Sequence, residues 1–223
     1  AARTVVGDIV PIAEIQQKVG IPCVAYAFIG TSEIRKLAES WDIELIVKRS
    51  TEAIAFAVKE GVEVAYVTED TTRARPETLR EIWKSALETG ARRLCLADTV
   101  GHATRDGVRN LVVFTRALID ETGIDGVGLD WHGHNDRGLA LDNALWALEY
   151  GIDRIHGCAL GIGERTGNTP MELLLLNLWL QSELELPDPS ALDRYCEVAA
   201  RACKWTGRRL SSDRGAAEWQ ALL

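Results

Sequence analysis

Two histidines separated by one residue are the most chemically specific feature of the chain. His132 and His134 lie in the segment Asp-Trp-His-Gly-His-Asn-Asp, which begins at Asp130. On a β-strand, residues i and i+2 point to the same face, so both imidazoles would face one site. Imidazole nitrogens are common ligands of divalent transition metals, and Asp130 or Asp136 could orient a ligating ring. The pair predicts a metal site; two strand histidines that only form hydrogen bonds are the simpler alternative.

A glycine-rich segment follows the histidine pair. It reads Gly-Ile-Gly-Glu-Arg-Thr-Gly-Asn from Gly161 to Asn168. Glycines allow a backbone to approach a ligand closely. Glu164 and Arg165 would form a charge pair at the mouth of a pocket, and the amide oxygen of Asn168 could bind a hard or borderline cation. A simple glycine-rich turn is the alternative interpretation.

Two further polar segments directly follow apolar runs. In the segment that begins at Asp98, Thr99 could donate to a substrate carboxylate, whereas Asp98 could support the site or cap the next helix. In the other segment, Glu69 and Arg73 could lie over a substrate, with Arg73 pairing with a carboxylate or phosphate. A helix cap with a solvated run of charges explains that second segment equally simply.

Three more polar residues are weaker candidates. Ser32 fits an N-cap and could also contact a ligand. His102 is typical of a solvent-facing loop. His156 lies in a strand-like run, two residues before Cys158, which favours a packed residue or a pocket wall over a metal ligand.

Short apolar runs alternate with amphipathic stretches along the chain. The predicted strands are Cys23–Ile29, Val62–Val67, Arg93–Ala97, Gly126–His132 and Arg154–Leu160. The predicted helices are Ser32–Glu39, Thr51–Glu60, Pro76–Thr89, Arg105–Thr122, Leu139–Tyr150, Pro170–Leu180 and Ser190–Lys204. One strand and one helix recur every ~30–40 residues, which indicates parallel strands with helical crossovers.

The polar segments all follow predicted strands, and this indicates the class of fold. Both α/β barrels and open doubly wound sheets build their sites at the carboxyl ends of strands. A barrel is favoured, because inward-facing residues of several strands converge on one metal only if the sheet curls. The nucleotide-binding Gly-x-Gly-x-x-Gly pattern is also absent from the chain.

The strand count is too low for a whole barrel. Five strands and a possible remnant at Thr4–Ile9 are recognisable, whereas a (β/α)8 TIM barrel needs eight. We therefore predict an α/β fold: a TIM barrel that lacks its N-terminal strands, with about five to six βα units. The partial barrel would span residues 1–185, and a C-terminal helical segment would span 186–223.

Composition and charge exclude several classes of protein. The net charge of −8 and the absence of a basic stripe argue against nucleic acid as a partner. The apolar run Leu173–Leu176 is far too short for a membrane span. The five cysteines are scattered without a Cys-x-x-Cys pair, as expected for reduced thiols in a cytoplasmic protein.

Four motifs occur in the order seen in one enzyme family. They are Glu-Asp-Thr-Thr-Arg from Glu69, Asp-Thr-Val-Gly from Asp98, His-Gly-His-Asn-Asp from His132 and the glycine-rich segment that ends at Asn168. Together they resemble the 2-isopropylmalate synthase and homocitrate synthase family of metal-dependent, aldolase-like TIM barrels, which is related to HMG-CoA lyase. The Gly-Glu-Arg sequence favours the synthase branch, because the lyases carry a cysteine-containing loop there.

The resemblance implies an acyltransferase that condenses acetyl-CoA with a 2-oxo acid in leucine-type amino-acid biosynthesis. It implies a divalent metal (Zn, Mn or Mg) and a homodimer in the full-length protein. The implied metal ligands are His132, His134 and Asn168, and the implied catalytic residues are Glu69, Thr99, Arg73 and Arg165. The implied substrate-binding residues are Ser32, Thr99, Asn135, Gly163 and Glu164. A carbon–carbon lyase on the same barrel and a truncated pseudoenzyme that only binds are the alternatives.

The chain departs from the family pattern in two places. Relatives carry an Arg-Asp segment on their first strand, whose Asp is a metal ligand, and no such segment occurs before Cys23. Many relatives have a histidine shortly after the Thr-Ser pair that ends at Ser32, where this chain has Ile34 and Arg35. We therefore expect this polypeptide alone to bind metal weakly and to turn over slowly.

Overall fold

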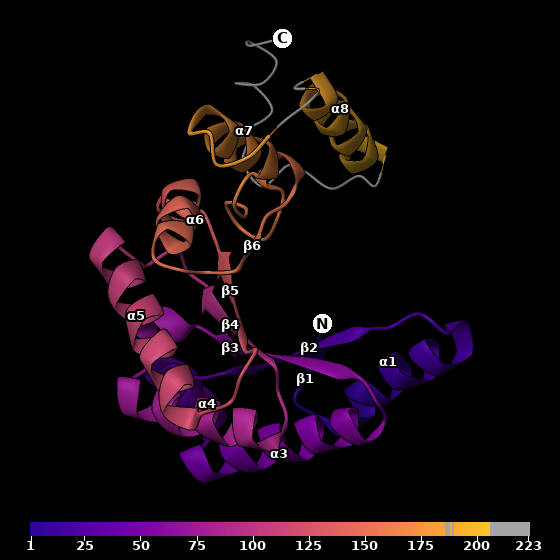
Figure 1. Ribbon diagram of the computed structural model, residues 1–223, viewed down its shortest axis with the longest axis vertical. Coiled ribbons are helices and arrows are strands. Elements are labelled where there is room, and N and C mark those ends of the chain that lie inside the picture. Colours follow the sequence, from indigo (N-terminus) through magenta and orange to yellow (C-terminus); the bar gives the residue numbers. More distant parts are fainter. Residues whose placement is uncertain (186–187, 189, 206–223) are drawn as a thin grey trace.

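The computed structural model describes residues 1–185, 188 and 190–205. Its centre is one six-stranded sheet in which all strands are parallel and pair in chain order (Figure 1). The strands are β1 (Ala2–Arg3), β2 (Val24–Gly30), β3 (Glu63–Glu69), β4 (Arg93–Asp98), β5 (Gly128–Gly133) and β6 (Arg154–His156). The predicted α/β class and the five to six βα units are thereby confirmed.

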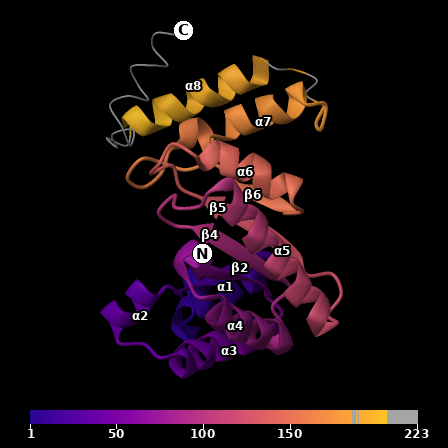
Figure 2. The same cartoon turned by 90° about the vertical axis from the view of Figure 1, so that its left-hand side faces the viewer.

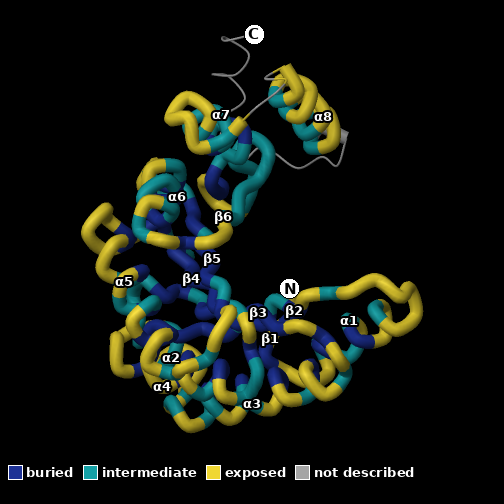
Figure 3. Tube along the Cα trace, viewed as in Figure 1, coloured by how far each residue is buried: buried dark blue, intermediate teal, exposed yellow. Residues whose placement is uncertain are grey.

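Helices cover the outer face of this sheet (Figure 1). The helices of the described residues are α1 (Val6–Val19), α2 (Glu33–Glu39), α3 (Ile43–Lys59), α4 (Pro76–Thr89), α5 (Arg105–Thr122), α6 (Ala140–Glu149), α7 (Met171–Leu180) and α8 (Ser190–Trp205), of which α7 and α8 lie beyond the sheet (Figure 1). Two 3-10 turns, η1 (Thr71–Arg73) and η2 (Ala159–Gly161), follow strands. Buried residues concentrate on the strands and on the helix faces that pack against them (Figure 3), so the apolar core lies between sheet and helices. No helix in the described residues is long and apolar enough to cross a membrane.

The sheet is curled like part of a barrel. The hydroxyl of Tyr26 on β2 donates to Asp130 on β5 over 2.8 Å and accepts from Arg154 on β6, also over 2.8 Å. In a flat sheet, strands three places apart would be separated by about 14 Å. Side chains of β2 and β5 can therefore meet only across a concave face. Within the described residues the barrel is not closed, and β1 and β6 are its edges.

Strand alternation divides the residues of the sheet between its two faces. On β5, Leu129 and Trp131 are buried against the helices, whereas Asp130 and His132 belong to the concave face. Strand register places Ala97, His132 and His156 side by side near the carboxyl ends of β4, β5 and β6. Polar groups of different strands are thus gathered at one end of the curled sheet.

The predicted helices Pro76–Thr89 and Arg105–Thr122 match α4 and α5, but the N-terminal prediction is wrong. Residues 4–9 are not a strand, because β1 ends at Arg3 and α1 starts at Val6. Ile9 and Ala13, one helical turn apart, are buried against the sheet, and this contact favours a helix over an extended β-branched run. Helix α3 likewise begins eight residues before the predicted Thr51, at Ile43, where Asp42 caps it by accepting from the backbone N–H of Leu45.

Strand β6 is shorter than predicted, since it ends at His156 instead of Leu160. The backbone of Cys158 instead pairs with that of Thr169 and Met171. Because Cys158 bonds to these residues and not to β5, the chain turns away from β5 and enters the glycine-rich segment.

Helices α7 and α8 extend the molecule beyond the sheet (Figure 2). Helix α8 packs against η2, near the predicted site. It matches the helix predicted from Ser190, whereas residues 206–223 of the predicted C-terminal segment lie outside the described part of the chain. The division at residue 185 stays a prediction.

Candidate metal and substrate site

The two histidines converge at the carboxyl end of β5. Their Nε2 atoms lie 3.2 Å apart and their rings are nearly perpendicular, at 89°. A zinc–imidazole bond is about 2.1 Å long, so two neighbouring ligands of one ion have nitrogens about 3 Å apart. The spacing of His132 and His134 therefore suits a shared cation.

Asn168 lies directly beside His134, because the two residues form an isolated antiparallel bridge. Its Nδ2 donates to the carbonyl of Ile162 over 2.9 Å, which orients the amide, and its Oδ1 is buried without a hydrogen-bond partner. A Cβ on Gly163 would come within 2.2 Å of that Nδ2, so only glycine permits this approach. The buried, unpartnered oxygen is what a bound cation would satisfy.

The environment keeps both imidazoles neutral, which is the form that binds metals. Burial, reinforced by the neighbouring His134 and His156, lowers the pKa of His132 to about 4. Burial and then Arg165 also lower the pKa of His134. Its Nδ1 is buried without a partner. His132, His134 and Asn168 thus fit a divalent cation by position, by protonation and by the unsatisfied oxygen of Asn168. The two Nε2 atoms also lie at hydrogen-bonding distance from each other, as in the simpler alternative.

The predicted supporting carboxylates are engaged elsewhere. Asp130 binds Arg93, Tyr26 and His156, and Asp136 binds Arg165. Within the described residues, no group of three or more His, Cys, Asp and Glu side chains could hold a metal ion. The candidate ligand set therefore consists of two imidazoles and one amide.

A polar cluster on the concave face went unrecognised in the sequence. Asp130 is fully buried and accepts from Arg93 Nη1 at 2.5 Å and from His156 Nε2 at 3.2 Å. Burial raises the pKa of this carboxyl, but its bonds to His156, Tyr26 and Arg93 outweigh burial and lower it. The alternation of Arg93, Asp130 and His156 with apolar neighbours was the available signal. His156 is a packed residue, one of the two alternatives favoured over a metal ligand, and its ring lies 5.7 Å from that of His132.

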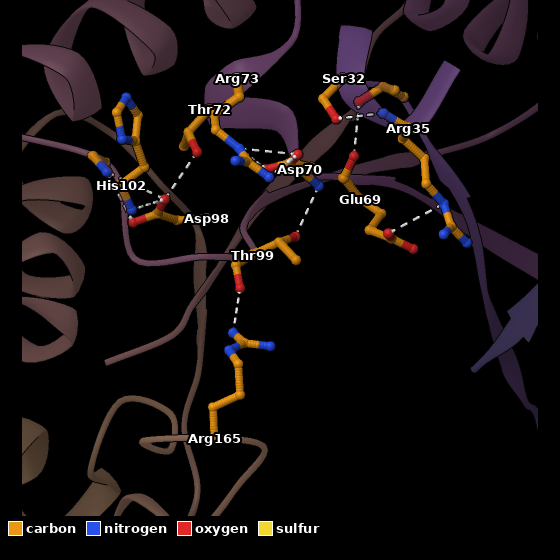
Figure 4. Close-up of polar contacts among 12 residues, drawn as sticks. Ser32, Arg35, Glu69, Asp70, Thr72, Arg73, Asp98, Thr99, His102 and Arg165 are labelled. Atoms are coloured by element: carbon orange, nitrogen blue, oxygen red, sulfur yellow. Dashed lines mark hydrogen bonds and ion pairs between the residues drawn. The ribbon is translucent and has the colours of Figure 1, made fainter. Parts of the chain in front are cut away.

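Glu69 ends β3 at the mouth of the site, and Arg35 lies over it (Figure 4). Arg35 Nε is 3.6 Å from Glu69 Oε1, and Arg35 Nη1 is 3.2 Å from Glu39 Oε1. A Cβ on Gly30 would collide with the Arg35 side chain at 2.2 Å, so the glycine that ends β2 makes room for it. The guanidinium of Arg35, a residue at which the chain departs from the family pattern, therefore lies beside Glu69, a predicted catalytic residue.

Thr99 and Arg73 lie on the loops that follow β4 and β3 (Figure 4). Thr99 Oγ1 accepts from the backbone N–H of Asp70 over 2.8 Å, which leaves its hydroxyl proton available to a substrate. The guanidinium of Arg73 is held by both carboxylate oxygens of Asp70, with contacts from 2.7 to 3.1 Å. Arg73 is therefore paired within the protein, and substrate pairing by it stays a prediction.

Arg165 ties together the loops after three strands. Its guanidinium binds Asp136, at 2.7 and 3.0 Å, and the carbonyl of Thr99, at 2.5 Å. Its backbone is left-handed, with φ 56°. Glu164 is 3.4 Å from Arg165, but its side chain is 81% exposed. The predicted charge pair exists, and Arg165 orders the mouth through Asp136.

The remaining candidates have structural contacts. Ser32 is buried and caps α2 by accepting from the backbone N–H of Arg35. Asn135 Oδ1 accepts from the backbone N–H of Ala140 at the start of α6. Asp98 does not cap the following helix, because Thr104 is the N-cap of α5. The carboxylate of Asp98 instead supports the loop before α5, where it accepts from the backbone N–H groups of His102 and Ala103. Substrate contacts by Ser32 and Asn135 stay predictions.

Comparisons with known proteins identify the family of the chain. Residues 16–199 match the family model described as HMGL-like. Mitochondrial homocitrate synthase of Schizosaccharomyces pombe is 37% identical over 153 residues, which cover 68% of this chain. The 2-isopropylmalate synthase of Methylacidiphilum infernorum is 34% identical over 179 residues, which cover 79% of it. The aligned region is only 35% of each relative's length.

Solved structures share the fold. Hydroxymethylglutaryl-CoA lyase from Pseudomonas aeruginosa has a TM-score of 0.72 at 21% identity, covering 93% of this chain and 71% of the lyase. HMG-CoA lyase from Brucella melitensis has a TM-score of 0.69 at 18% identity, covering 89% and 71%. At these identities the likeness concerns the fold alone. The family match covers most of the chain and includes all the convergent residues, and the chain therefore belongs to the HMGL-like family.

Proposed function

We propose that this chain is part of an acyltransferase that condenses acetyl-CoA with a 2-oxo acid, using a divalent metal (Zn, Mn or Mg). The observation that carries the proposal is the convergence of His132, His134 and the unpartnered Asn168 Oδ1. Arg165 links this group to the loop that carries Thr99, because it binds both Asp136 and the Thr99 carbonyl. The relatives named 2-isopropylmalate synthase and homocitrate synthase support the same reaction class. Cytoplasmic location and a homodimer stay predictions from the sequence.

The residues divide the chemistry between them. A divalent cation bound by His132, His134 and Asn168 would supply Lewis-acid polarisation of the oxo group. The Thr99 hydroxyl, held by the Asp70 N–H, donates to the carboxylate of the oxo acid. The Glu69 carboxylate lies at the open mouth, where it accepts a proton from the acetyl methyl group. Arg165 keeps the surrounding loops in place.

Metal binding tests the first half of the proposal. Calorimetric titration with Mn²⁺ and Zn²⁺ should show saturable binding to the chain, and His134→Ala and Asn168→Ala should each weaken it by at least about tenfold. His102→Ala is the matched control, because His102 lies on the helix side of the sheet. Unchanged binding in both site variants would remove the metal site.

Turnover tests the second half. Release of free CoA from acetyl-CoA should require both the metal and a 2-oxo acid, with 2-oxoisovalerate, 2-oxoglutarate and pyruvate as the panel, and Glu69→Gln should abolish it. Cleavage of a 3-hydroxyacyl-CoA without condensation would assign the site to a carbon–carbon lyase. Metal binding with neither reaction would identify a binding domain without catalysis.

A further inference from the structure

A cavity of about 480 Å³ lies on the helix side of the sheet, away from the concave face. Its apolar floor includes Leu79 of α4 and Leu111 and Phe114 of α5. Its volume is within the range of about 300–1,000 Å³ typical of small-molecule pockets. None of the residues assigned above to metal or substrate lines it.

The rim of this cavity is polar and carries a cation. His102, Asn110 and Arg137 line it together with threonine side chains. Arg137 Nη1 donates to the carbonyl of His102 over 2.9 Å. Across the described residues, no Asp or Glu lies within ion-pair distance of Arg137, so its charge is not neutralised within this part of the protein. An apolar floor under an uncompensated guanidinium suits an apolar molecule with one acidic group.

The carboxylate of Asp98 lies near this rim, but its hydrogen bonds offset its repulsion of a bound anion. Asp98 is fully buried, and its oxygens accept from the Thr72 hydroxyl and from the backbone N–H groups of His102 and Ala103 (Figure 4). Thr72, His102 and Ala103 line the cavity, and Asp98, which bonds to all three, directly precedes Thr99 in the chain. One buried carboxylate therefore connects the cavity lining to the loop that carries Thr99.

We propose that the cavity between α4 and α5 binds a small apolar carboxylate, with its carboxylate on Arg137 and its apolar part on Leu79, Leu111 and Phe114. The site is separate from the proposed metal and substrate site. Ligand binding there contacts Thr72 and His102 and, through Asp98, alters the environment of Thr99.

The test uses 3-phenylpropanoate, its neutral amide and acetate as probes, in NMR titrations of the full chain with EDTA present. The acid should bind saturably with a dissociation constant of about 1 mM or tighter. The amide, which cannot pair with Arg137, should bind at least about fivefold more weakly. Acetate, which has no apolar part, should not bind measurably.

Two variants locate the binding. Gly107 lies on the cavity wall, and a Cβ there would have only one ordinary contact, with Thr104 Oγ1 at 3.4 Å, so Gly107→Leu should fold and fill the cavity. It should abolish binding of the acid. Arg137→Gln should make the acid and the amide bind equally, whereas Arg109→Gln, a charge change on α5 outside the cavity, should change nothing.

The proposal is overturned if the acid binds Gly107→Leu as tightly as the wild type, because the ligand then lies elsewhere, for instance near Arg35. It is also overturned if acid and amide bind the wild type equally, or if no probe binds at up to about 10 mM. Arg137→Gln removes an exposed guanidinium and its bond to the His102 carbonyl, so it remains informative even if Gly107→Leu fails to fold.

Discussion

At the scale of single residues, the site is defined by polar atoms that the protein itself leaves unsatisfied. Asn168 Oδ1 and His134 Nδ1 are buried without partners, as are Trp131 Nε1 and Glu172 Oε1 on adjoining segments. Buried unpaired polar atoms cost free energy, on the order of 1–3 kcal/mol each. The unpartnered oxygen of Asn168, on the residue bridged to His134, supports a ligand at that point.

The protonation of His132 predicts a pH dependence of folding. Burial lowers the pKa of this imidazole from 6.5 to about 4, so on acidification the unfolded chain takes up the proton first. The contribution of His132 to the free energy of unfolding is therefore fully present above pH 6.5, the pKa in the unfolded chain. It is lost as the pH falls toward about 4, the pKa in the folded chain. We expect a loss of about 2 kcal/mol between about pH 7 and pH 5, measured by urea unfolding in EDTA.

The variant His132→Asn should lose most of this slope. His134, whose pKa burial also lowers, retains a smaller contribution of the same sign. Asp130, whose pKa lies below its usual value of 3.8, contributes only at lower pH. An equal slope in the wild type and His132→Asn would contradict the buried, neutral imidazole.

At the scale of elements, the glycine-rich segment positions Asn168 by leaving space for it. The segment turns at Gly161 and Arg165, both left-handed, and carries Gly163 against the Asn168 amide. The loop is held from outside by Arg165 and Asp136. The position of the Asn168 amide thus depends on a glycine at residue 163, because a side chain there would collide with it.

Gly163→Ala should weaken Mn²⁺ binding by about tenfold or more, because its methyl group would displace the Asn168 amide. Calorimetric titration measures the effect. Gly7→Ala is the control, since a Cβ on Gly7 meets nothing within 4 Å. Equal affinity in Gly163→Ala and the wild type would remove Asn168 from the ligand set.

At the scale of the whole molecule, the curl of the sheet depends on the cluster around Asp130. This carboxylate on β5 binds Tyr26 from β2, Arg93 from β4 and His156 from β6. It therefore joins strands that lie apart in the sheet, and it lies on the same face as the histidine pair. The cluster both shapes the concave face and lies below the site.

Asp130→Ala should destabilise the fold by about 3–5 kcal/mol in urea unfolding, because it leaves the Arg93 guanidinium without its partner. The double variant Arg93→Met/Asp130→Leu should lose clearly less than the single variant. Glu88→Ala, which breaks an exposed pair with Lys84, should cost under about 1 kcal/mol. A single and a double variant of equal stability would contradict this role of the ion pair.

Local sequence periodicity by itself determined much of this architecture. The alternation of strands and helices, the end of β5 at the histidine pair and the placing of His132 and Asp130 on one face all follow from side-chain repeats of two and 3.6 residues. The helices α4 and α5 were predictable to the residue, since a proline and a glycine bound α4 and Thr104 and Gly123 bound α5. These signals depend only on residues close together in the chain, so they can be read from the sequence alone.

Only the tertiary structure decided which polar groups meet. Arg73 and Asp136 could each have faced a substrate or a metal-bound ring, but they pair with Asp70 and Arg165. The partners of Asp130 come from residues 26, 93 and 156, and α1 is a helix because Ile9 and Ala13 pack on the sheet. Such pairings depend on the curl and register of distant strands, and no local repeat encodes them.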